Sequence, residues 1–347
     1  MSEARISHEL SNTRDDKPLL TVHSLVKHFA LNAGLPGRAS ARTVKAVNGV
    51  SFELHRGETL GLVGESGCGK STVARTLLRL EEPTAGEARF HGDNIFAANA
   101  IELKAVRRRI QVIFQDPYAS LNPRWRIEQI VSEPWRIHPD VVPRSKWRDR
   151  VGELLESVGL RREHAERYPH EFSGGQRQRI GIARAIALDP EIIICDEPVS
   201  ALDVSVQAQV VNLLESFQQR LGIAYVFIAH DLSVVRHMAH RVAVMYLGHI
   251  VEIGDKDTIY TRPAHPYTQA LMSAQPRLDF TVGRRDRATS TRIVLQGEVP
   301  NPANPPSGCA FRTRCWKAME ICATQAPTLG GSSTHQVACH FPTLPES

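Results

Sequence analysis

The alternation of apolar and polar positions predicts strands and helices that follow one another along much of the chain. The apolar run Thr59–Val63 is typical of a buried strand, and it leads through a glycine-rich turn into the helical sequence of residues 71–80. A second apolar run at Ile192–Cys195 precedes a helix expected over Ser205–Leu221, which Gly222 should end. The apolar positions of that helix recur every three or four residues, as a single buried stripe requires: Val206, Val210, Leu213, Phe217 and Leu221. This alternation predicts an α/β fold in which helices cover a mostly parallel sheet.

Several segments depart from the alternation and suggest how the chain is divided. Residues 1–18 are polar and lack apolar periodicity, which predicts a mobile tail. Residues 31–42, rich in glycine, proline and small side chains, predict a long hairpin loop between two strands, and a second hairpin is expected around Gly248–His249. Residues from about 116 to 172 carry three tryptophans and many arginines, which predicts a separate helical subdomain. The proline-rich residues 261–347 predict a small C-terminal domain.

The composition is that of an ordinary globular protein. The 347 residues include 42 lysines and arginines against 37 aspartates and glutamates, and the net charge of +5 is too small to indicate a nucleic-acid partner. The longest apolar stretch, Gly222–Ala229, is well short of the ~20 residues that a membrane helix needs. The N-terminus lacks the apolar core of a secretory signal. We therefore expect a cytosolic chain that reaches a membrane only by docking onto another subunit.

The turn after the first strand matches the phosphate-binding pattern G-x-x-x-x-G-K-S/T over residues 64–72, hereafter the phosphate loop. The backbone amides of such a loop, and of the helix that follows, point at one place and bind phosphate oxygens. Lys70 should reach the β- and γ-phosphates of a nucleotide, and the Ser71 hydroxyl should ligate Mg²⁺. The expected nucleotide-binding residues are Gly64, Ser66, Gly67, Cys68, Gly69, Lys70, Ser71 and Thr72.

Two adjacent acids end the strand that begins at Ile192. Asp196, at the strand end, is placed to hold Mg²⁺ through its water shell. Glu197, one residue further, is placed to polarise the water that attacks the γ-phosphate. Beside a phosphate loop, this pair predicts nucleotide hydrolysis.

The remaining motifs follow in an order that resembles the ATP-binding cassette (ABC) family of transporter ATPases over about residues 19–260. After the phosphate loop these motifs are Gln115, Ser173-Gly174-Gly175-Gln176, Asp196-Glu197, Asp203 and His230. The resemblance implies a phosphate-loop NTPase core with a mostly parallel sheet, an antiparallel β subdomain and a helical subdomain, followed by a small cysteine-rich domain. ATP and Mg²⁺ are the implied cofactors.

The resemblance also implies a role for each motif residue. Ser173 can cap a helix whose free amides face a phosphate, and in the family the Ser173–Gln176 motif binds the ATP held by the other subunit of a dimer. Gln115 resembles a residue that contacts Mg²⁺ and the attacking water, and His230 resembles one that contacts the γ-phosphate. Asp203 resembles a dimer-contact residue. Phe29 stands where the family stacks an aromatic ring on adenine, although a core phenylalanine is the alternative.

A finer resemblance is to the second, F-type, ATPase of dipeptide and oligopeptide importers, a group that includes nickel importers. It rests on segments spread over the chain: residues 114–123, 168–185, 196–210, 230–237 and 265–271. It implies a heterodimer with a second ATPase subunit, two transmembrane permease subunits and an extracytoplasmic substrate-binding protein. The chain would lie on the cytoplasmic face of the inner membrane. Nickel or another small solute is the alternative cargo.

Four of the six cysteines crowd the C-terminal region, at positions Cys309, Cys315, Cys322 and Cys339. In a cytosolic chain such a group indicates metal or cluster binding before disulfides. Four thiolates can bind Zn²⁺ or a 4Fe-4S cluster, and unliganded thiols are a third possibility. The paired C-x₂₋₄-C knuckles of zinc ribbons are absent from the sequence. The subgroup resemblance favours the 4Fe-4S cluster. The ATP site is expected to be complete without this region. Cys68 and Cys195 are expected to be buried.

Two rival classes share the core motifs. One is a soluble cassette ATPase of translation or DNA repair, which usually carries two cassettes or long coiled-coil insertions, and this sequence has one cassette and no such insertion. The other is an exporter ATPase. The segment from His265 to Thr268 and the four C-terminal cysteines argue against it.

Overall fold

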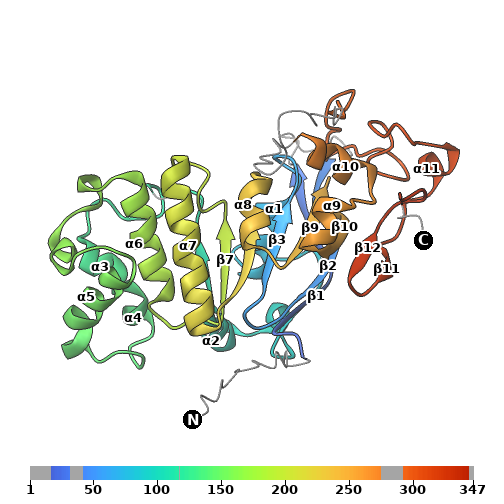
Figure 1. Ribbon diagram of the computed structural model, residues 1–347. Coiled ribbons are helices and arrows are strands. Elements are labelled where there is room, and N and C mark those ends of the chain that lie inside the picture. Colours follow the sequence, from blue (N-terminus) through green and yellow to red (C-terminus); the bar gives the residue numbers. More distant parts are fainter. Residues whose placement is uncertain (1–16, 32–41, 117, 275–291, 344–347) are drawn as a thin grey trace, which may run out of the picture.

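The computed structural model describes residues 17–31, 42–116, 118–274 and 292–343 (Figure 1). Nearly all of the expected tail, residues 1–18, lies outside these ranges. The loop expected over residues 31–42 also falls mostly outside them. The strands on its two sides pair antiparallel, with Ala30 opposite Thr43.

The strands of the described residues form two sheets. Their bounds are β1 Leu20–Leu31, β2 Arg42–Leu54, β3 Thr59–Val63, β4 Ala85–Phe90, β5 Asp93–Asn94, β6 Ile110–Ile113, β7 Ile192–Asp196, β8 Ala224–Ile228, β9 Arg241–Tyr246, β10 His249–Asp255, β11 Gly330–Ser332 and β12 His335–Val337. The smaller sheet is antiparallel, in the order β2-β1-β4-β5. The larger sheet has the order β11-β12-β10-β9-β3-β8-β7-β6. Its strands β6, β7, β8, β3 and β9 are parallel to one another, as the alternation of strands and helices predicts, whereas β10 pairs antiparallel with β9.

Both faces of the parallel strands are buried, and alternate residues enter two different cores. On β7, Ile193 and Cys195 pack into the core formed with the helices, whereas Ile192 and Ile194 pack into the core formed with the smaller sheet. Such strands are continuous apolar runs because neither face meets water. This is why the run at Ile192 is apolar throughout.

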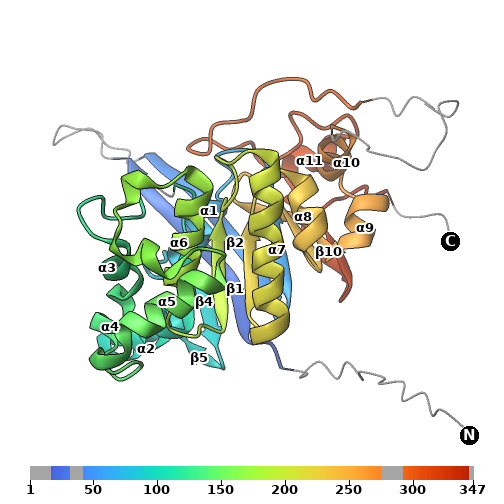
Figure 2. The same ribbon diagram turned by 60° about the vertical axis from the view of Figure 1, so that its left-hand side comes forward.

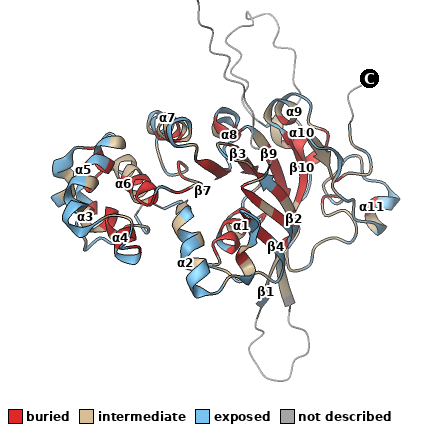
Figure 3. Cartoon of the chain, turned by 90° about the horizontal axis from the view of Figure 1, so that it is seen from below, coloured by how far each residue is buried: buried red, intermediate tan, exposed pale blue. Residues whose placement is uncertain are grey.

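The helices cover both faces of the larger sheet (Figures 2 and 3). Their bounds are α1 Lys70–Leu77, α2 Ala100–Arg109, α3 Ile127–Val131, α4 Glu133–Ile137, α5 Trp147–Ser157, α6 Gly174–Ile186, α7 Val204–Leu221, α8 Leu232–Met238, α9 Lys256–Thr261, α10 Pro266–Ser273 and α11 Glu320–Thr324. Short 3₁₀ helices are η1 Ile95–Ala97, η2 Arg144–Lys146, η3 Arg162–Glu166 and η4 Pro169–Glu171. Seen from below, α7 and α8 lie on one side of the sheet, and α1 and the smaller sheet lie on the other.

The helix and hairpin expectations agree closely with the structure. Helix α7 ends at Leu221, and Gly222 follows in the left-handed conformation with φ of 67°. The hairpin between β9 and β10 turns at Leu247 and Gly248, both with positive φ, as a tight two-residue turn requires. Helix α1 is shorter than expected and ends at Leu77.

The segment from 116 to 172 is mainly helical and stands apart from the sheet, at the left of Figure 1. Trp135 is fully buried, and its indole Nε1 donates a hydrogen bond of 2.8 Å to the carbonyl of Ala187, the residue that follows helix α6. Trp147 packs on Trp135 with ring centroids 5.9 Å apart. The tryptophans that mark this segment in the sequence therefore form the centre of its packing.

The C-terminal region adds strands to the larger sheet. Strand β12 pairs antiparallel with β10, and its His335 forms an ion pair of 2.8 Å with the buried Glu252. Phe311 enters the main core. Strands β11 and β12 thus extend the ATPase sheet. The expectation that residues 261–347 fold as a separate domain stays a prediction.

Candidate functional site

The candidate site lies at the carboxyl ends of four neighbouring parallel strands. The phosphate loop follows β3, Gln115 follows β6 by two residues, Glu197 directly follows β7, and His230 follows β8 by two residues. These strands are adjacent in the order β3-β8-β7-β6. Ligands of open α/β sheets bind outside the carboxyl ends of the strands, and the sheet itself therefore brings these motifs together.

The phosphate loop passes close to strand β2 before entering helix α1. Gly69 has φ of 109°, and a Cβ at this position would lie 2.1 Å from the carbonyl oxygen of Ala46, so only glycine fits. Lys70 is buried, and its Nζ donates to the carbonyls of Gly64 at 2.8 Å and Glu65 at 3.1 Å. The lysine ammonium is thereby held within the loop whose amides bind phosphate.

Ser71 and Asp196 meet beside the loop although they are 125 residues apart. The Ser71 hydroxyl donates a hydrogen bond of 2.8 Å to Asp196 Oδ1. Burial raises the pKa of the Asp196 carboxyl, and the hydrogen bond from Ser71 partly opposes that rise. A hydroxyl and a carboxylate oxygen are the kind of ligands that Mg²⁺ prefers, so this pair fits a Mg²⁺ site.

Two polar side chains converge on the Glu197 carboxylate. Gln115 Nε2 donates to Glu197 Oε2 at 3.0 Å, and His230 Nδ1 lies 3.3 Å from the same oxygen. Glu197 has φ of 49°, a value that is uncommon outside glycine, and its amide donates to the Ile228 carbonyl at 3.0 Å. Strained residues cluster at functional sites, and here the strain directs an acid at the sheet edge.

These groups surround a hollow of about 310 Å³, hereafter the phosphate-loop hollow. Its lining residues are Val44, Ala46, Ser66, Gly67, Gly69, Lys70, Ser71, Thr72, Gln115, Glu197, His230 and Pro302. Gly64, Cys68 and Asp196 lie next to the hollow without lining it. No local sequence pattern marks Val44, Ala46 or Pro302 as site residues.

Other expected site residues lie outside this hollow. Phe29 packs on the β1–β2 hairpin opposite Val44, with Lys27 Nζ 4.6 Å from its ring centroid, and only its partner Val44 lines the hollow. Asp203 is the residue before helix α7, and its side chain makes no capping hydrogen bond there.

The Ser173–Gln176 motif begins helix α6 and is also absent from the hollow. Ser173 is exposed, and its hydroxyl accepts a 3.4 Å hydrogen bond from the Gln176 amide. The Gln176 side chain accepts from the Ser173 amide at 3.1 Å, which completes a capping box. The N-terminal end of helix α6 therefore lies at the surface and not at this chain's own phosphate loop.

The four C-terminal cysteines lie near one another. Burial raises the pKa of the Cys309, Cys315 and Cys339 thiols, and neighbouring cysteines of the set raise it further. Among the described residues, however, no group of three or more His, Cys, Asp or Glu side chains could hold a metal ion. The 4Fe-4S cluster thus stays a prediction.

The two remaining cysteines and two histidines of the C-terminal region have structural surroundings. Cys68 and Cys195 are buried, as expected. His335 pairs with Glu252, and His340 Nε2 lies 3.0 Å from the carbonyl oxygen of Gln325. Neither histidine is grouped with the thiols as a ligand.

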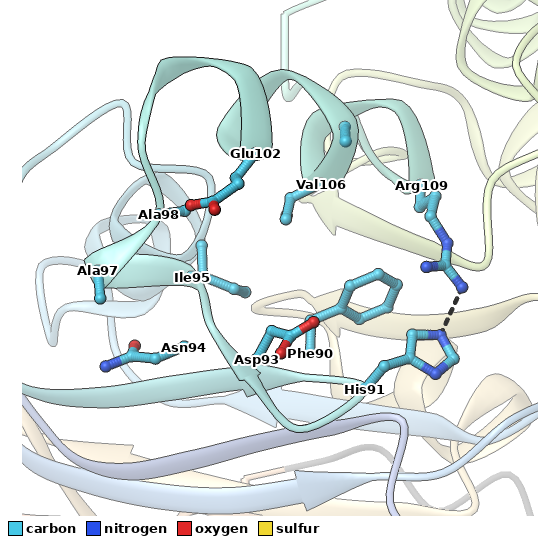
Figure 4. A pocket seen from close by; sticks show the side chains of 11 residues that line it. Phe90, His91, Asp93, Asn94, Ile95, Ala97, Ala98, Glu102, Val106 and Arg109 are labelled. Carbon is cyan, nitrogen blue, oxygen red and sulfur yellow. Dashed lines mark hydrogen bonds between the residues drawn. The ribbon is translucent and has the colours of Figure 1, made fainter.

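A second hollow, of about 430 Å³, lies between β4, β5 and α2 (Figure 4). Arg109 and His91 face each other across one side of it, with Arg109 Nη2 2.7 Å from His91 Nε2. Both also contact Glu191, which pairs with Arg56 at 2.8 Å. This network ties α2 and the smaller sheet to the start of β7, and we assign the hollow a structural role.

The comparisons with known proteins agree with this geometry. Residues 47–200 match the model of the ABC transporter family, and residues 251–322 match the C-terminal region of oligopeptide and dipeptide transporters. A dimeric ATP-binding cassette, MJ0796, in a post-hydrolysis state with ADP and phosphate, superposes with a TM-score of 0.61. It is 27% identical and is matched over 68% of this chain and 98% of its own. The fold is that of an ABC ATPase.

Longer and closer relatives define the branch of the family. The oligopeptide transport ATP-binding protein AppF of Bacillus subtilis is 52% identical over 94% of this chain and 98% of its own length. The oligopeptide transport ATP-binding protein OppF of Escherichia coli is 52% identical over 94% and 97%, and the dipeptide transport ATP-binding protein DppF of the same organism is 51% identical over 93% and 94%. The chain belongs to the ABC family and, within it, to the peptide transport ATP-binding proteins, which confirms the prediction from its motifs. No helix of the described residues is long and apolar enough to cross a membrane.

Proposed function

We propose that this chain is the ATP-hydrolysing subunit of an importer for dipeptides or oligopeptides. The observation that carries the proposal is the phosphate-loop hollow, in which Lys70 and Ser71 face Gln115, Glu197 and His230. A phosphate-binding loop and a carboxylate that can activate water meet there. The peptide transport relatives supply the class of cargo.

Each residue of the hollow has a distinct part in the proposed hydrolysis. The loop amides and Lys70 bind the β- and γ-phosphates, and His230 contacts the γ-phosphate. Glu197 accepts a proton from the attacking water while Gln115 orients that water. Bound Mg²⁺ would neutralise charge on the phosphate oxygens, and Ser71, Asp196 and Gln115 would hold it. Phe29 remains the proposed adenine contact, reached along the β1–β2 hairpin.

Dimerisation would complete the site. The Ser173–Gln176 motif is exposed and lies outside this chain's own hollow, so we assign its free amides, together with Asp203, to the ATP held by a second ATPase subunit. The second subunit's corresponding motif would close over this chain's phosphate loop in the same way. Two ATP molecules would then lie between the subunits, and hydrolysis would reopen the dimer.

A groove beside the helical subdomain is the proposed dock for a permease subunit. Its volume is about 730 Å³, and Phe114, the neighbour of Gln115, lines it. Leu80 and Ile137 on its rim are each about half exposed, at 53% and 52%. An apolar rim of this kind suits a helix of a partner chain. The chain would thus attach to the cytoplasmic face of the membrane through two permease subunits, with a substrate-binding protein on the far side.

Vesicles that carry the assembled importer should accumulate a labelled di- or oligopeptide only when ATP is enclosed at the face where this chain lies. Lys70→Ala in the same assembly should remove that accumulation, because the γ-phosphate loses its ammonium partner. Radiolabel counting after filtration measures the uptake. Uptake of a nickel chelate but of no peptide would contradict the peptide cargo, and peptide uptake without ATP would contradict the ATPase role.

The C-terminal thiols are proposed to hold one 4Fe-4S cluster. Each iron of such a cluster takes one thiolate, so four cysteines suffice. The Cys309, Cys315 and Cys339 thiols each lie close enough to other cysteines of the set for these to raise their pKa, which supports a shared site. The Cys315 and Cys339 sulfurs each accept a backbone N–H at 3.4 Å, from Lys317 and Phe341, and such bonds are a feature of cluster sites.

Cys322→Ser should abolish the visible absorbance and the bound iron of anaerobically purified protein. Thiolate ligation is lost, and the C-terminal region, which has few apolar residues of its own, should become more sensitive to protease. Cys195→Ala is the matched control, because Cys195 is buried in β7 away from this set, and it should keep its iron. Metal analysis that finds one zinc and no iron in the wild type would contradict the cluster.

A further inference from the structure

Arg314 links the C-terminal region to the side chain of a phosphate-loop residue. Arg314, which directly precedes Cys315, donates from Nη1 to Glu65 Oε2 at 2.7 Å and from Nη2 to Glu65 Oε1 at 3.1 Å. Glu65 is the second residue of the phosphate loop. Two parallel bonds between a guanidinium and a carboxylate fix orientation as well as distance. The Arg314 side chain is only 8% exposed, so solvent screens the pair weakly.

The segment that carries Arg314 is anchored to the core. Phe311 is 1% exposed and packs against Tyr246 and Tyr267, with ring centroids 5.2 and 5.4 Å away. The Tyr267 hydroxyl in turn accepts a 2.9 Å hydrogen bond from the Glu65 amide. Both the backbone and the side chain of Glu65 are therefore held by residues outside the phosphate loop. Pro302, also in the C-terminal region, lines the hollow.

The charge of Glu65 explains why such a partner is needed. The Glu65 carbonyl accepts a hydrogen bond of 3.1 Å from Lys70 Nζ, the proposed phosphate ligand. The Glu65 carboxylate is therefore part of a loop that binds a polyanion. An uncompensated carboxylate there would repel the phosphates of a nucleotide, the more so because the surroundings are partly buried. Arg314 is the ion-pair partner of Glu65 among the described residues, and it cancels this charge.

We propose that Arg314 is a positioning residue of the ATP site. It neutralises Glu65 and holds the phosphate loop in its binding shape, so that the C-terminal region sets the chain's affinity for ATP. Arg314 acts through Glu65 and does not contact the nucleotide. The proposal rests on the ATP site assigned to residues 64–72 under the proposed function.

The test is the ATPase kinetics of the importer assembled from this chain, the second ATPase and the permeases. Arg314→Gln should raise the KM for ATP by about ten-fold, or about 1.4 kcal/mol of binding, and change kcat by less than about two-fold. Glu65→Gln alone should lower KM by about two-fold, because the freed guanidinium attracts phosphate. The double variant should bring KM back to within about two-fold of the wild type. A purely structural contact predicts that both single variants raise KM equally and that the double variant restores nothing, and that result would overturn the proposal.

Arg312→Gln is the matched control. Arg312 lies on the same segment, two residues away, but it donates to the Ser307 carbonyl at 2.9 Å and not to the phosphate loop. Its KM should equal that of the wild type, and a KM raised as far as in Arg314→Gln would overturn the proposal. If Arg314→Gln does not fold, Arg314→Lys is the substitute variant. Lysine keeps the positive charge but cannot form the two parallel hydrogen bonds of the guanidinium, so the KM for ATP should rise by about three-fold.

Lys70→Ala separates this proposal from the one on which it rests. If Lys70→Ala binds a fluorescent ATP analogue as tightly as the wild type, the assigned ATP site itself is wrong. If Lys70→Ala loses binding while Arg314→Gln keeps its KM within about two-fold of the wild type, only the role of Arg314 is refuted.

Discussion

Glu197→Gln is expected to lower ATP hydrolysis at this chain's own site by at least about 100-fold while ATP stays bound. The amide keeps the size of the side chain and its place beside Gln115 and His230, but it cannot accept the proton of the attacking water. Nucleotide affinity should change little, because the phosphate loop and Lys70 remain intact. Phosphate release and binding of a fluorescent ATP analogue, measured on the same preparation, separate the two effects.

In the assembled importer the second ATPase subunit can mask part of this loss, so hydrolysis should be scored at both sites. Glu215→Gln provides the control. Glu215 lies on helix α7, paired with His237 at 3.4 Å, and its replacement removes an equal charge away from the hollow. Hydrolysis by Glu197→Gln within about two-fold of the wild type at this chain's site would show that another group activates the water.

Ser173→Asp is expected to abolish hydrolysis at the second subunit's site and not at the site that contains Lys70. Aspartate caps a helix as well as serine does, so helix α6 should persist, but its charge would face the γ-phosphate. Combined with Glu197→Gln, it should therefore remove the activity that Glu197→Gln alone leaves, by about 100-fold. If Ser173 acted on this chain's own nucleotide, the double variant would match Glu197→Gln alone.

Ser173→Asn is the matched control for the charge. Asparagine has the size of aspartate and is an equally good helix cap, but it is neutral. Its residual activity in the Glu197→Gln background should exceed that of the aspartate variant. Equal losses in both would attribute the effect to bulk, and a structure with a bound ATP analogue beside both Lys70 and Ser173 of one chain would refute the assignment to the second subunit.

Much of the candidate site could be predicted from the sequence because each part depends on a few neighbouring residues. The phosphate loop needs glycines and a lysine at fixed spacing, and the acid pair follows a fully apolar strand. Once the parallel order of the strands is accepted, their carboxyl ends must meet, which places Gln115, Glu197 and His230 together. The position of Phe29 is harder to predict, because the sequence of a hairpin strand does not indicate which of its side chains reaches the hollow.

The C-terminal region was also hard to predict. Its prolines and cysteines suggested a small domain of its own with no part in the ATP site. In the structure its strand β12 joins the ATPase sheet, and Phe311 fills the main core. Composition indicates how a segment is built, but it does not indicate which surface the segment covers.

Periodicity and short-range spacing specify local structure, so the order of strands and helices, the phosphate loop and the acids of the site follow from the sequence alone. The long-range packing of the folded chain is what brings Val44 and Pro302 to the hollow and Arg314 to Glu65. Glu65 and Arg314 are 249 residues apart. The contact between them depends on how the aromatic cluster around Phe311 packs against the sheet. A contact of this kind produces no repeating pattern in the sequence.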